Sequence, residues 1–346
     1  MTKGEERDGV PLTNLDQELF EGADATKRDL VDYLDAVSDL IIGQLRDKPL
    51  SVIRVLRGQQ PFMQKNVPKY TPDFVQTVPV WAEASHREVA YALCNDRRTL
   101  LWFANQRAVE YHPTLMRAGH WDNPEYLVLD LDPPGGQDLP GGQPEDTAGA
   151  FGQAVRAALA VRQALAAAGL AGAIKTSGAK GVHVFVPLAP GQTAAHAAAA
   201  TRAIAARAEK LEPGLATTAF VRQDRGGKVF VDATRAGGAT VVAAYSPRVR
   251  PGTPVSFPVS WDDISSVQPR DFAVRNAAGL LAGRDHWAQL LPEPQLLPAD
   301  LVEEGMQIPI ARVQAMHEGK RRARARRDRG PDEDKEGNED AVRHSD

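Results

Sequence analysis

The sequence predicts a protein of the α+β class, in which helices and strands both contribute to the core. A helix-like repeat of apolar residues begins after Thr26 and ends near Gly43, and a strand-like segment follows at 48–55. The run 126–129, an aromatic and three aliphatic residues, is typical of a buried strand, and two more strand-like segments, 173–176 and 182–186, enclose a glycine-containing turn. At 346 residues, the chain is long enough for one large domain or two packed modules.

Composition limits the functional classes. The chain is 42 % hydrophobic and 25 % charged, which is typical of a soluble globular protein. It lacks an apolar run of roughly 18 residues, and its N-terminus is too charged for a signal peptide, so we expect a cytoplasmic protein without a membrane partner. The single cysteine, Cys94, excludes an internal disulfide framework and a cysteine-cluster zinc site. A metal would therefore be bound by oxygen.

The N-terminal third contains a basic segment. Residues 1–12 show no periodicity, so we expect a flexible terminus, and Thr26 is placed to cap the following helix. The net charge of −4 does not favour a polyanionic partner. A local patch can still hold phosphates, although a solvated basic face is an alternative. Between Ile42 and Tyr70 the only acidic residue is Asp47, and the basic residues are Arg46, Lys48, Arg54, Arg57, Lys65 and Lys69.

An aromatic residue lies close to a lysine in the polar loop 61–66. Phe62 and Lys65 would suit a stacked nucleic-acid base and its neighbouring phosphate. A Phe-Met pair such as Phe62-Met63 is, however, more often part of a core. Alternating short runs between Val78 and Tyr111 predict a mixed α/β module, and the following His112 is not distinguished by chemistry alone.

Two carboxylates end the strand that begins at Tyr126. Asp130 and Asp132 alternate with leucines and precede a double proline, so both side chains project from one face. Like charges this close repel unless a cation lies between them, and hard ions such as Mg²⁺ prefer oxygen ligands. The spacing therefore favours a metal-dependent phosphoryl-transfer site. A helix cap or a solvated loop entrance is the structural alternative.

A glycine-bracketed turn follows a helix predicted from about Thr147 to Ala168. The segment 177–183 can point backbone N–H groups into one concavity and adds the donors Ser177, Lys180 and His183. This arrangement suits a triphosphate. It is not a P-loop, because the turn leads into a strand instead of a helix. A plain hairpin turn is the alternative.

A third carboxylate appears downstream of an alanine-rich helix predicted from Thr193 to about Lys210. Asp232 ends a short strand after a basic turn that contains Arg225. It could be an ordinary strand-end residue, but with the first two aspartates it would complete a two-metal site. Thr240 to Ala244 predicts another strand, and Arg248 follows it. Residues 320–329 include seven lysines or arginines, which predicts a disordered, charge-segregated tail.

Eight motifs in order resemble the bacterial archaeo-eukaryotic primase superfamily. The similarity is to the polymerase domain of the end-joining ligase D and to the stand-alone primase-polymerases that accompany ligase C, and it covers about Leu12 to Leu281. The motifs are Thr26-Lys27-Arg-Asp-Leu-Val-Asp-Tyr, Lys48-Pro49-Leu50, Phe62-Met-Gln-Lys65-Asn, Tyr111-His112-Pro113, Leu129-Asp130-Leu-Asp132-Pro, Ser177-Gly-Ala-Lys-Gly-Val-His183, Val229-Phe-Val-Asp232 and Tyr245-Ser-Pro-Arg248.

The resemblance implies an RRM-like catalytic sheet packed on an N-terminal α/β module. It places the polymerase in residues 13–292, divided near 115, with an extension at 293–318 and the charged tail at 319–346. It implies that two Mn²⁺ or Mg²⁺ ions bind to Asp130, Asp132 and Asp232. The DNA-binding residues would be Lys27, Phe62 and Lys65. The implied nucleotide-binding residues are Arg54, His112, Ser177, Gly178, Lys180, Gly181, His183, Arg225 and Arg248.

Four positions depart from the family pattern. The family usually has two adjacent aromatic residues, but here Met63 takes the place of the second. Gln17 stands where the ligase D branch usually has lysine, and Arg235-Ala236 replaces a polar pair after the third aspartate. The Gln17 departure puts recognition of a recessed 5′-phosphate in doubt.

The preferred hypothesis is a template-dependent nucleotidyltransferase in DNA repair, including end joining, that accepts ribonucleotides. Its partners would be gapped or primer-template DNA, nucleoside triphosphates, a DNA ligase and a Ku-type end-binding protein. One alternative is a non-catalytic module that binds DNA ends or gaps. Another is a phosphatase with Asp130 as nucleophile and Asp132 as acid, which the double proline and the third aspartate disfavour.

Overall fold

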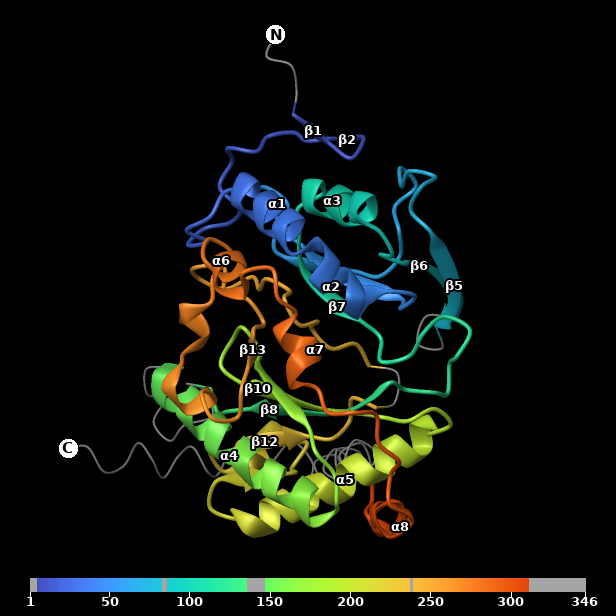
Figure 1. Cartoon of the computed structure of the whole chain (residues 1–346), viewed down its shortest axis with the longest axis vertical. Helices are drawn as coiled ribbons and strands as arrows, with labels where there is room; N and C mark the ends of the chain where they lie inside the picture. The colour runs from blue at the N-terminus through green and yellow to red at the C-terminus, as the bar shows by residue number, and fades with distance from the viewer. Residues whose placement is uncertain (1–4, 83–85, 136–146, 237–238, 311–346) are drawn as a thin grey trace, which may run out of the picture.

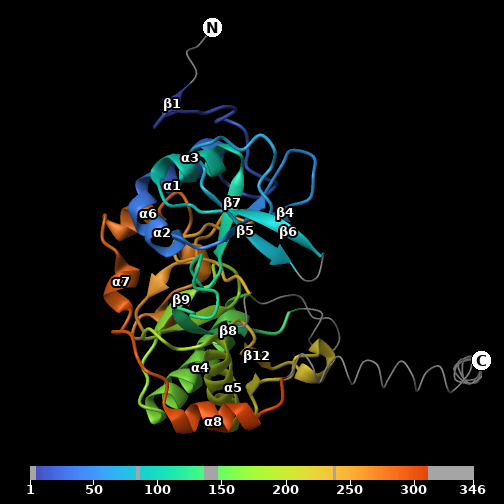
Figure 2. The ribbon, with the colours of Figure 1, turned by 90° about the vertical axis from the view of Figure 1, so that its right-hand side faces the viewer.

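The computed structural model describes residues 5–82, 86–135, 147–236 and 239–310. Two sheets, one from each half of the chain, lie one above the other along the long axis of the molecule (Figures 1 and 2). The predicted charged tail lies outside the described residues. Within the described ranges, no helix has the length and apolar character needed to cross a membrane.

The N-terminal half contains three helices and a five-stranded sheet. Four strands follow the order β4-β3-β6-β5, and β7 also pairs with β3. The helices are α1 (Lys27–Ala36), α2 (Ser38–Leu45) and α3 (Arg97–Asn105). The strands are β3 (Leu50–Arg54), β4 (Phe62–Gln64), β5 (Thr77–Ala82), β6 (Arg87–Ala92) and β7 (Ala108–Pro113).

Two expectations for this half need correction. Thr26 does cap α1, but the single predicted helix is broken at Val37, whose ψ of 15° ends α1 before α2 begins. Residues 5–12 were expected to be flexible. They instead form the hairpin of β1 (Glu6–Arg7) and β2 (Val10–Pro11) because Val10 is buried and Arg7 forms ion pairs with Asp32 and Asp35 of α1.

The C-terminal half is built on a six-stranded sheet with the order β11-β12-β8-β10-β9-β13. All its strand pairs are antiparallel except the one between β11 and β12, which fits the predicted α+β class. The strands are β8 (Tyr126–Asp132), β9 (Ala173–Thr176), β10 (Val182–Pro187), β11 (Ala216–Thr217), β12 (Val229–Asp232) and β13 (Pro258–Val259). The helices α4 (Thr147–Ala167) and α5 (Ala194–Leu211) pack against this sheet (Figure 1).

The short helix η3 (Arg222–Arg225) precedes β12. The described chain after β13 consists of short helices, which are η4 (Ile264–Ser266), η5 (Pro269–Asp271), α6 (Ala277–Leu281), α7 (His286–Leu290) and α8 (Ala299–Gln307). Helix α8 lies directly on α5, where a Cβ at Gly305 would come within 1.8 Å of the Ala199 carbonyl oxygen. The close backbone approach explains the glycine at this position. Residues 299–307 therefore pack onto helix α5 of the C-terminal half.

The predicted strand 240–244 is not a regular strand. Thr240 forms one isolated bridge with Thr114, and the N–H groups of Val241 and Ala243 donate to the carbonyls of Pro113 and Tyr111. The bonds run to one side only, so the segment follows the end of β7 without joining a sheet. It links the two halves.

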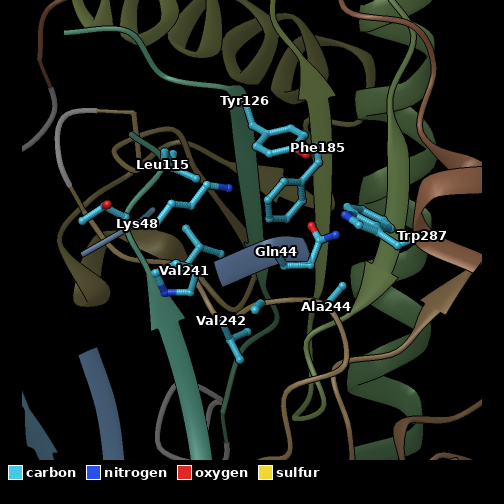
Figure 3. A pocket seen from close by; sticks show the side chains of 12 residues that line it. Gln44, Lys48, Leu115, Tyr126, Phe185, Val241, Val242, Ala244 and Trp287 are labelled. Atoms are coloured by element: carbon cyan, nitrogen blue, oxygen red, sulfur yellow. The ribbon is translucent and has the colours of Figure 1, made fainter. Parts of the chain in front are cut away.

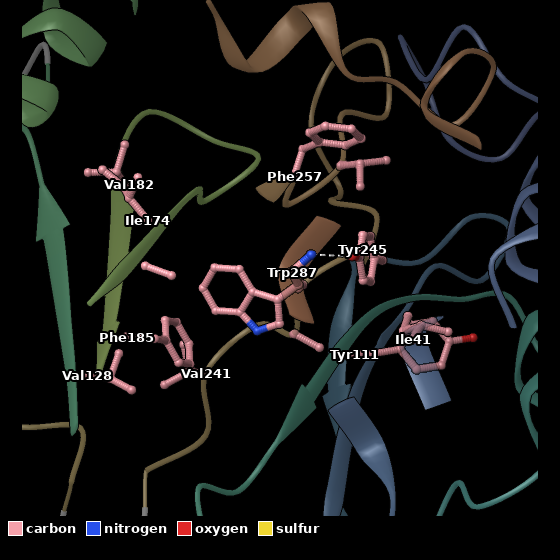
Figure 4. Packing of buried hydrophobic residues seen from close by; sticks show 14 of the residues in the cluster. Ile41, Tyr111, Val128, Ile174, Val182, Phe185, Val241, Tyr245, Phe257 and Trp287 are labelled. Atoms are coloured by element: carbon pink, nitrogen blue, oxygen red, sulfur yellow. Dashed lines mark hydrogen bonds between the residues drawn. The ribbon is translucent and has the colours of Figure 1, made fainter. Parts of the chain in front are cut away.

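Aromatic residues fill the space between the two sheets (Figure 4). The Trp287 ring meets that of Phe185 edge-on with centroids 5.3 Å apart, and the backbone N–H of Trp287 donates to the Tyr245 hydroxyl. Tyr33 of α1 donates to the Tyr245 carbonyl at 2.8 Å. Burial of such large apolar surfaces favours one fixed arrangement of the two halves.

Candidate active site

A row of polar residues crosses four strands of the C-terminal sheet. Asp232 of β12 pairs with Asp130 of β8, Asp130 pairs with His183 of β10, and His183 pairs with Lys175 of β9. Directly paired residues project from the same face of a sheet. The register therefore brings two of the three predicted aspartates together with the predicted histidine.

The row lies on the face of the sheet that looks toward the N-terminal half. Asp130 shares this face with Tyr126, because side chains alternate along a strand and the two residues are separated by an even number of positions. Lys48, from the N-terminal half, lies 5.4 Å from the centre of the Tyr126 ring and pairs with Glu125 at 2.7 Å. The site is thus close to the junction of the two halves.

A small cavity in the same junction is not a substrate site (Figure 3). Its volume is about 20 Å³, which is room for about one water molecule. It is lined mainly by apolar side chains, including Tyr126, Phe185 and Trp287.

Arg235 lies between two of the aspartates. Its Nη2 atom is 2.7 Å from Asp130 Oδ2 and 3.1 Å from Asp232 Oδ2. Its Nε atom is buried without a hydrogen-bond partner in the part of the chain that the structure describes. The sequence marks Arg235 as a departure from the family pattern, but it does not reveal this contact.

The pKa values of the two β8 aspartates move in opposite directions. Burial alone would raise the pKa of Asp130, but His183 and Arg235 outweigh it and hold the pKa well below its usual range. Asp132 lies exposed at the strand end, but desolvation of its carboxyl group and the charge of Asp130 raise its pKa to about 7. The neighbouring positive groups thus lower the pKa of Asp130, whereas burial and the neighbouring carboxylates raise that of Asp132.

The donor chemistry of this region fits a hard divalent cation. Three carboxylates offer oxygen ligands, and Asp130 and Asp232 already share a positive group, the Arg235 guanidinium. As they stand, the described side chains contain no cluster of three or more His, Cys, Asp or Glu residues arranged to hold a metal ion. A metal shared by Asp130 and Asp232 would therefore require Arg235 to move.

The glycine-containing turn lies beside the row. The Ser177 hydroxyl accepts from the N–H groups of Ala179 and Gly181, and the Ser177 N–H donates to the Gly181 carbonyl. Gly178 has a φ of +68°, a left-handed conformation that favours glycine. A Cβ at Gly181 would lie 2.2 Å from the Leu131 carbonyl oxygen, so the turn packs tightly on β8 between its two aspartates.

His112 and Arg248 approach the turn through a buried acid. Glu110 accepts from His112 Nε2 at 2.8 Å and lies 3.1 Å from Arg248 Nε. Arg248 also donates to the Ser177 carbonyl at 2.5 Å. Burial would raise the pKa of Glu110, but His112 and Arg248 lower it to about 2. Glu110 is not among the residues predicted from the sequence, although its spacing of two from His112 on a strand indicates that the two side chains share a face.

The remaining nucleotide candidates differ in position. Arg225 stacks on the Phe230 ring at 3.8 Å, and its charge acts on Asp132. Lys180 is half-buried in the turn. Arg54, also predicted to bind the nucleotide, lies on β3 of the N-terminal sheet.

Arg54 belongs to a separate cluster with an exposed aromatic residue. It is paired with Phe62 in the β3–β4 register and lies 5.9 Å from the Phe62 ring centre, while its guanidinium donates to Gln64, Tyr70 and Gln106. Phe62 is 37 % exposed and Lys65 is exposed. The Phe62 ring and the Lys65 ammonium group are therefore accessible to a ligand.

Lys27 is buried, in contrast to an open phosphate-binding lysine. It is 3 % exposed, and its ammonium group donates to the Thr13 carbonyl at 2.6 Å and to Asn105 Oδ1 at 2.7 Å. Burial and the charge of Arg107 lower the pKa of Lys27 to about 8. Gln17 contacts Lys27 through the backbone, because its carbonyl accepts from the Lys27 N–H. The residue is exposed.

Comparisons with known proteins agree on one family. Residues 26–287 match the family model described as LigD, primase-polymerase domain. The chain is similar to the bifunctional non-homologous end joining protein LigD of Bacillus subtilis (strain 168), with 33 % identity over 270 residues, 77 % of this chain and 41 % of that protein. It is also similar to the multifunctional non-homologous end joining DNA repair protein LigD of Mycobacterium tuberculosis (strain ATCC 25618 / H37Rv), with 31 % identity over 268 residues, 74 % of this chain and 33 % of that protein.

The chain thus spans less than half the length of these curated relatives. Among solved structures, it is similar to the polymerase domain from Mycobacterium tuberculosis ligase D in complex with DNA. The TM-score is 0.69 at 28 % sequence identity, and the match covers 81 % of this chain and 96 % of that chain. The predicted resemblance and the predicted fold class are confirmed.

Proposed function

The chain belongs to the family of LigD primase-polymerase domains, which are DNA-directed nucleotidyltransferases, and from this premise we propose that it fills short gaps or extends primers in DNA, opposite a template and with ribonucleotides accepted. The observation that carries the proposal is the position of the acidic row directly beside the glycine-containing turn. Nucleotidyl transfer needs these two features in contact, because the reacting phosphate lies between the metal ligands and the groups that hold the triphosphate.

We propose that Asp130, Asp132 and Asp232 hold two Mn²⁺ or Mg²⁺ ions. When bound, such ions would activate the 3′-hydroxyl and stabilise the charge on the leaving pyrophosphate. The chain itself supplies rigid placement of the ligands: Asp130 and Asp232 are fixed by the β8–β12 register, and Thr234 donates its N–H and its hydroxyl to Asp232 Oδ1. Rigid ligands on strands lower the cost of organising the site.

The incoming triphosphate would bind at the turn. Gly178 and Gly181 allow the backbone to approach closely, while Lys180, Arg225 and Arg248 bring positive charge that neutralises the phosphates. Arg248 is already oriented by Glu110 and by the Ser177 carbonyl. Ser177 and His183 shape the two ends of the turn, and His112 reaches it through Glu110.

The exposed cluster in the N-terminal half would contact DNA. Phe62 would stack on a template base and Lys65 would meet a backbone phosphate, with Arg54 supporting the Phe62 ring from behind. Lys27 would approach a 5′-phosphate only by sharing its ammonium group with Thr13 and Asn105. The structural relative bound to DNA supports a DNA substrate for this chain.

The curated relatives are named as end-joining proteins, and this supports a role in end joining. In that role a DNA ligase would seal the filled gap, and a Ku-type protein would hold the DNA ends. The setting would be the bacterial cytoplasm, at the nucleoid.

The test is templated extension of a primer across a short gap in a DNA duplex. Ribonucleotides and deoxyribonucleotides are compared with Mn²⁺ and with Mg²⁺, and the template base is varied. We expect the added nucleotide to follow the template base. DNA binding without incorporation under any of these conditions would instead support the non-catalytic gap-binding module.

A further inference from the structure

Lys175 is a fully buried lysine that the proposed chemistry does not use. It lies on β9 with 0 % exposure, at the inner end of the polar row. Its Nζ atom is 2.8 Å from His183 Nδ1 and 2.5 Å from Ser256 Oγ. Burial of an amine costs free energy unless the amine forms hydrogen bonds, and these two contacts provide them.

The hydrogen bonds around Lys175 have a defined direction. Asp130 carries a carboxylate, which only accepts, so His183 Nε2, 3.1 Å from Asp130 Oδ1, must hold the proton. The other nitrogen of a neutral imidazole, Nδ1, then accepts, and Lys175 is the donor. The Ser256 hydroxyl donates to the Thr176 carbonyl, so it too accepts from Lys175.

We propose that Lys175 is a positioning residue that acts through His183: it fixes the imidazole with its Nε2–H directed at Asp130 Oδ1. The Asp130 carboxylate is thereby held in one rotamer with Oδ2 directed at the cation position, where Arg235 now lies. This role rests on the proposed function of Asp130 as a metal ligand. An amine donates in either protonation state, so the role does not depend on the charge of Lys175.

Outer partners of metal ligands have measurable effects. A hydrogen bond that orients a ligand typically contributes ten- to hundredfold to metal affinity or activity. Here the partner is one step further removed, because it orients the histidine that orients the carboxylate. We therefore expect an effect near the lower end of that range.

The first experiment measures Lys175→Met, which keeps the length of the side chain and removes the donor. We expect the affinity for Mn²⁺, measured by calorimetry without nucleotide or DNA, to fall by about tenfold. The ¹⁵N shifts of the His183 ring should change from a single Nε2–H tautomer to a mixture of tautomers. Incorporation should lose kcat with little change in the KM for nucleotide.

A matched control is Lys48→Met, which removes the other strongly buried lysine that contacts an aromatic ring. It should lower stability without changing Mn²⁺ affinity or the His183 tautomer. If Lys175→Met does not fold, Ser256→Ala removes one anchor of the amine and should give the same changes with smaller size.

A double-mutant cycle separates this role from general packing. In a His183→Gln background, Lys175→Met should have no further effect on Mn²⁺ affinity, because its effect passes through the imidazole. An equal loss in both backgrounds, or an unchanged His183 tautomer in Lys175→Met, would overturn the proposal. A parent protein that binds no Mn²⁺ would refute the metal site, while the tautomer measurement would still report on Lys175.

Discussion

Asp130 and Asp232 are directly paired residues of two antiparallel strands, and their carboxylates share the guanidinium of Arg235. The pairing fixes two acids side by side, and the shared cation neutralises their repulsion. An arginine in this position is also a competitor for any metal that uses the same oxygens.

Replacement of Arg235 by Gln should therefore increase metal affinity. A metal would no longer have to displace the guanidinium, and we expect the dissociation constant for Mn²⁺ to decrease by about tenfold, or about 1.4 kcal/mol. The metal-free protein should at the same time melt at a lower temperature, because the aspartates repel. Calorimetry and thermal unfolding check both effects, with Arg235→Lys as the charge-conserving control. An unchanged dissociation constant would mean that Arg235 and the metal do not compete.

Glu110 should make stability depend on acid pH. Its pKa is held at about 2 in the folded protein, against an ordinary value of 4.5. A folded pKa below the unfolded one gives stability that is fully present above about pH 4.5 and is lost as the pH falls toward 2. The difference in pKa corresponds to about 3 kcal/mol at most.

Urea unfolding at about pH 7, 5 and 3 measures this effect in the parent protein and in Glu110→Gln. The variant should lose less stability than the parent between the two lower values. Glu303→Gln, at an exposed residue of α8, is the control and should behave like the parent. Parallel pH profiles for the parent and Glu110→Gln would contradict the prediction.

The contact of the turn with β8 predicts that Gly181 does not tolerate substitution. Gly181→Ala would place a Cβ 2.2 Å from the Leu131 carbonyl oxygen. We therefore expect the free energy of unfolding to fall by about 2 kcal/mol and the KM for nucleotide to rise. Gly214→Ala is the control, because nothing lies within 4 Å of a Cβ there. If Gly181→Ala matches that control in both measurements, the turn is not packed as described.

The position of Lys27 predicts weak discrimination of a 5′-phosphate. Its ammonium group is already bonded to two protein oxygens, and Gln17 offers no charge. The parent should prefer a 5′-phosphorylated gap by less than about a hundredfold, or about 2.7 kcal/mol, and Gln17→Lys should increase the preference. Binding is measured at fixed salt on duplexes that differ only in that phosphate. Gln289→Lys, an added charge on α7, controls for net charge; an equal gain in both variants would refute the assignment.

The sequence predicted most of the elements that form the site. Strand alternation correctly places Asp130 and Asp132 on one face, and the glycines around Ser177 correctly predict a turn between two strands. These features depend on residues close in the chain. The match to the family also indicated the fold before any contact was known.

Contacts between distant segments were not predictable in this way. The pairing of Asp232 with Asp130 and of Lys175 with His183 depends on strand register, which no local pattern specifies. Arg235 stands out in the sequence only as an unusual residue, and the position of Arg54 on a different sheet from the glycine-containing turn follows from strand order, which the sequence does not specify. The segment 240–244 is apolar enough for a strand, but its N–H groups meet only one neighbour.

The most direct test of the account is the rate of templated incorporation by Asp132→Asn. Asp132 is the exposed member of the three aspartates, so the substitution should leave the fold intact while it removes a charged metal ligand. The control is Asp262→Asn, an exposed aspartate outside the site. Single-turnover extension of a gapped duplex with Mn²⁺ should be slowed by at least about a hundredfold in Asp132→Asn, or about 2.7 kcal/mol, with DNA binding retained. A rate within about twofold of the parent would contradict the assignment of this row as the catalytic centre.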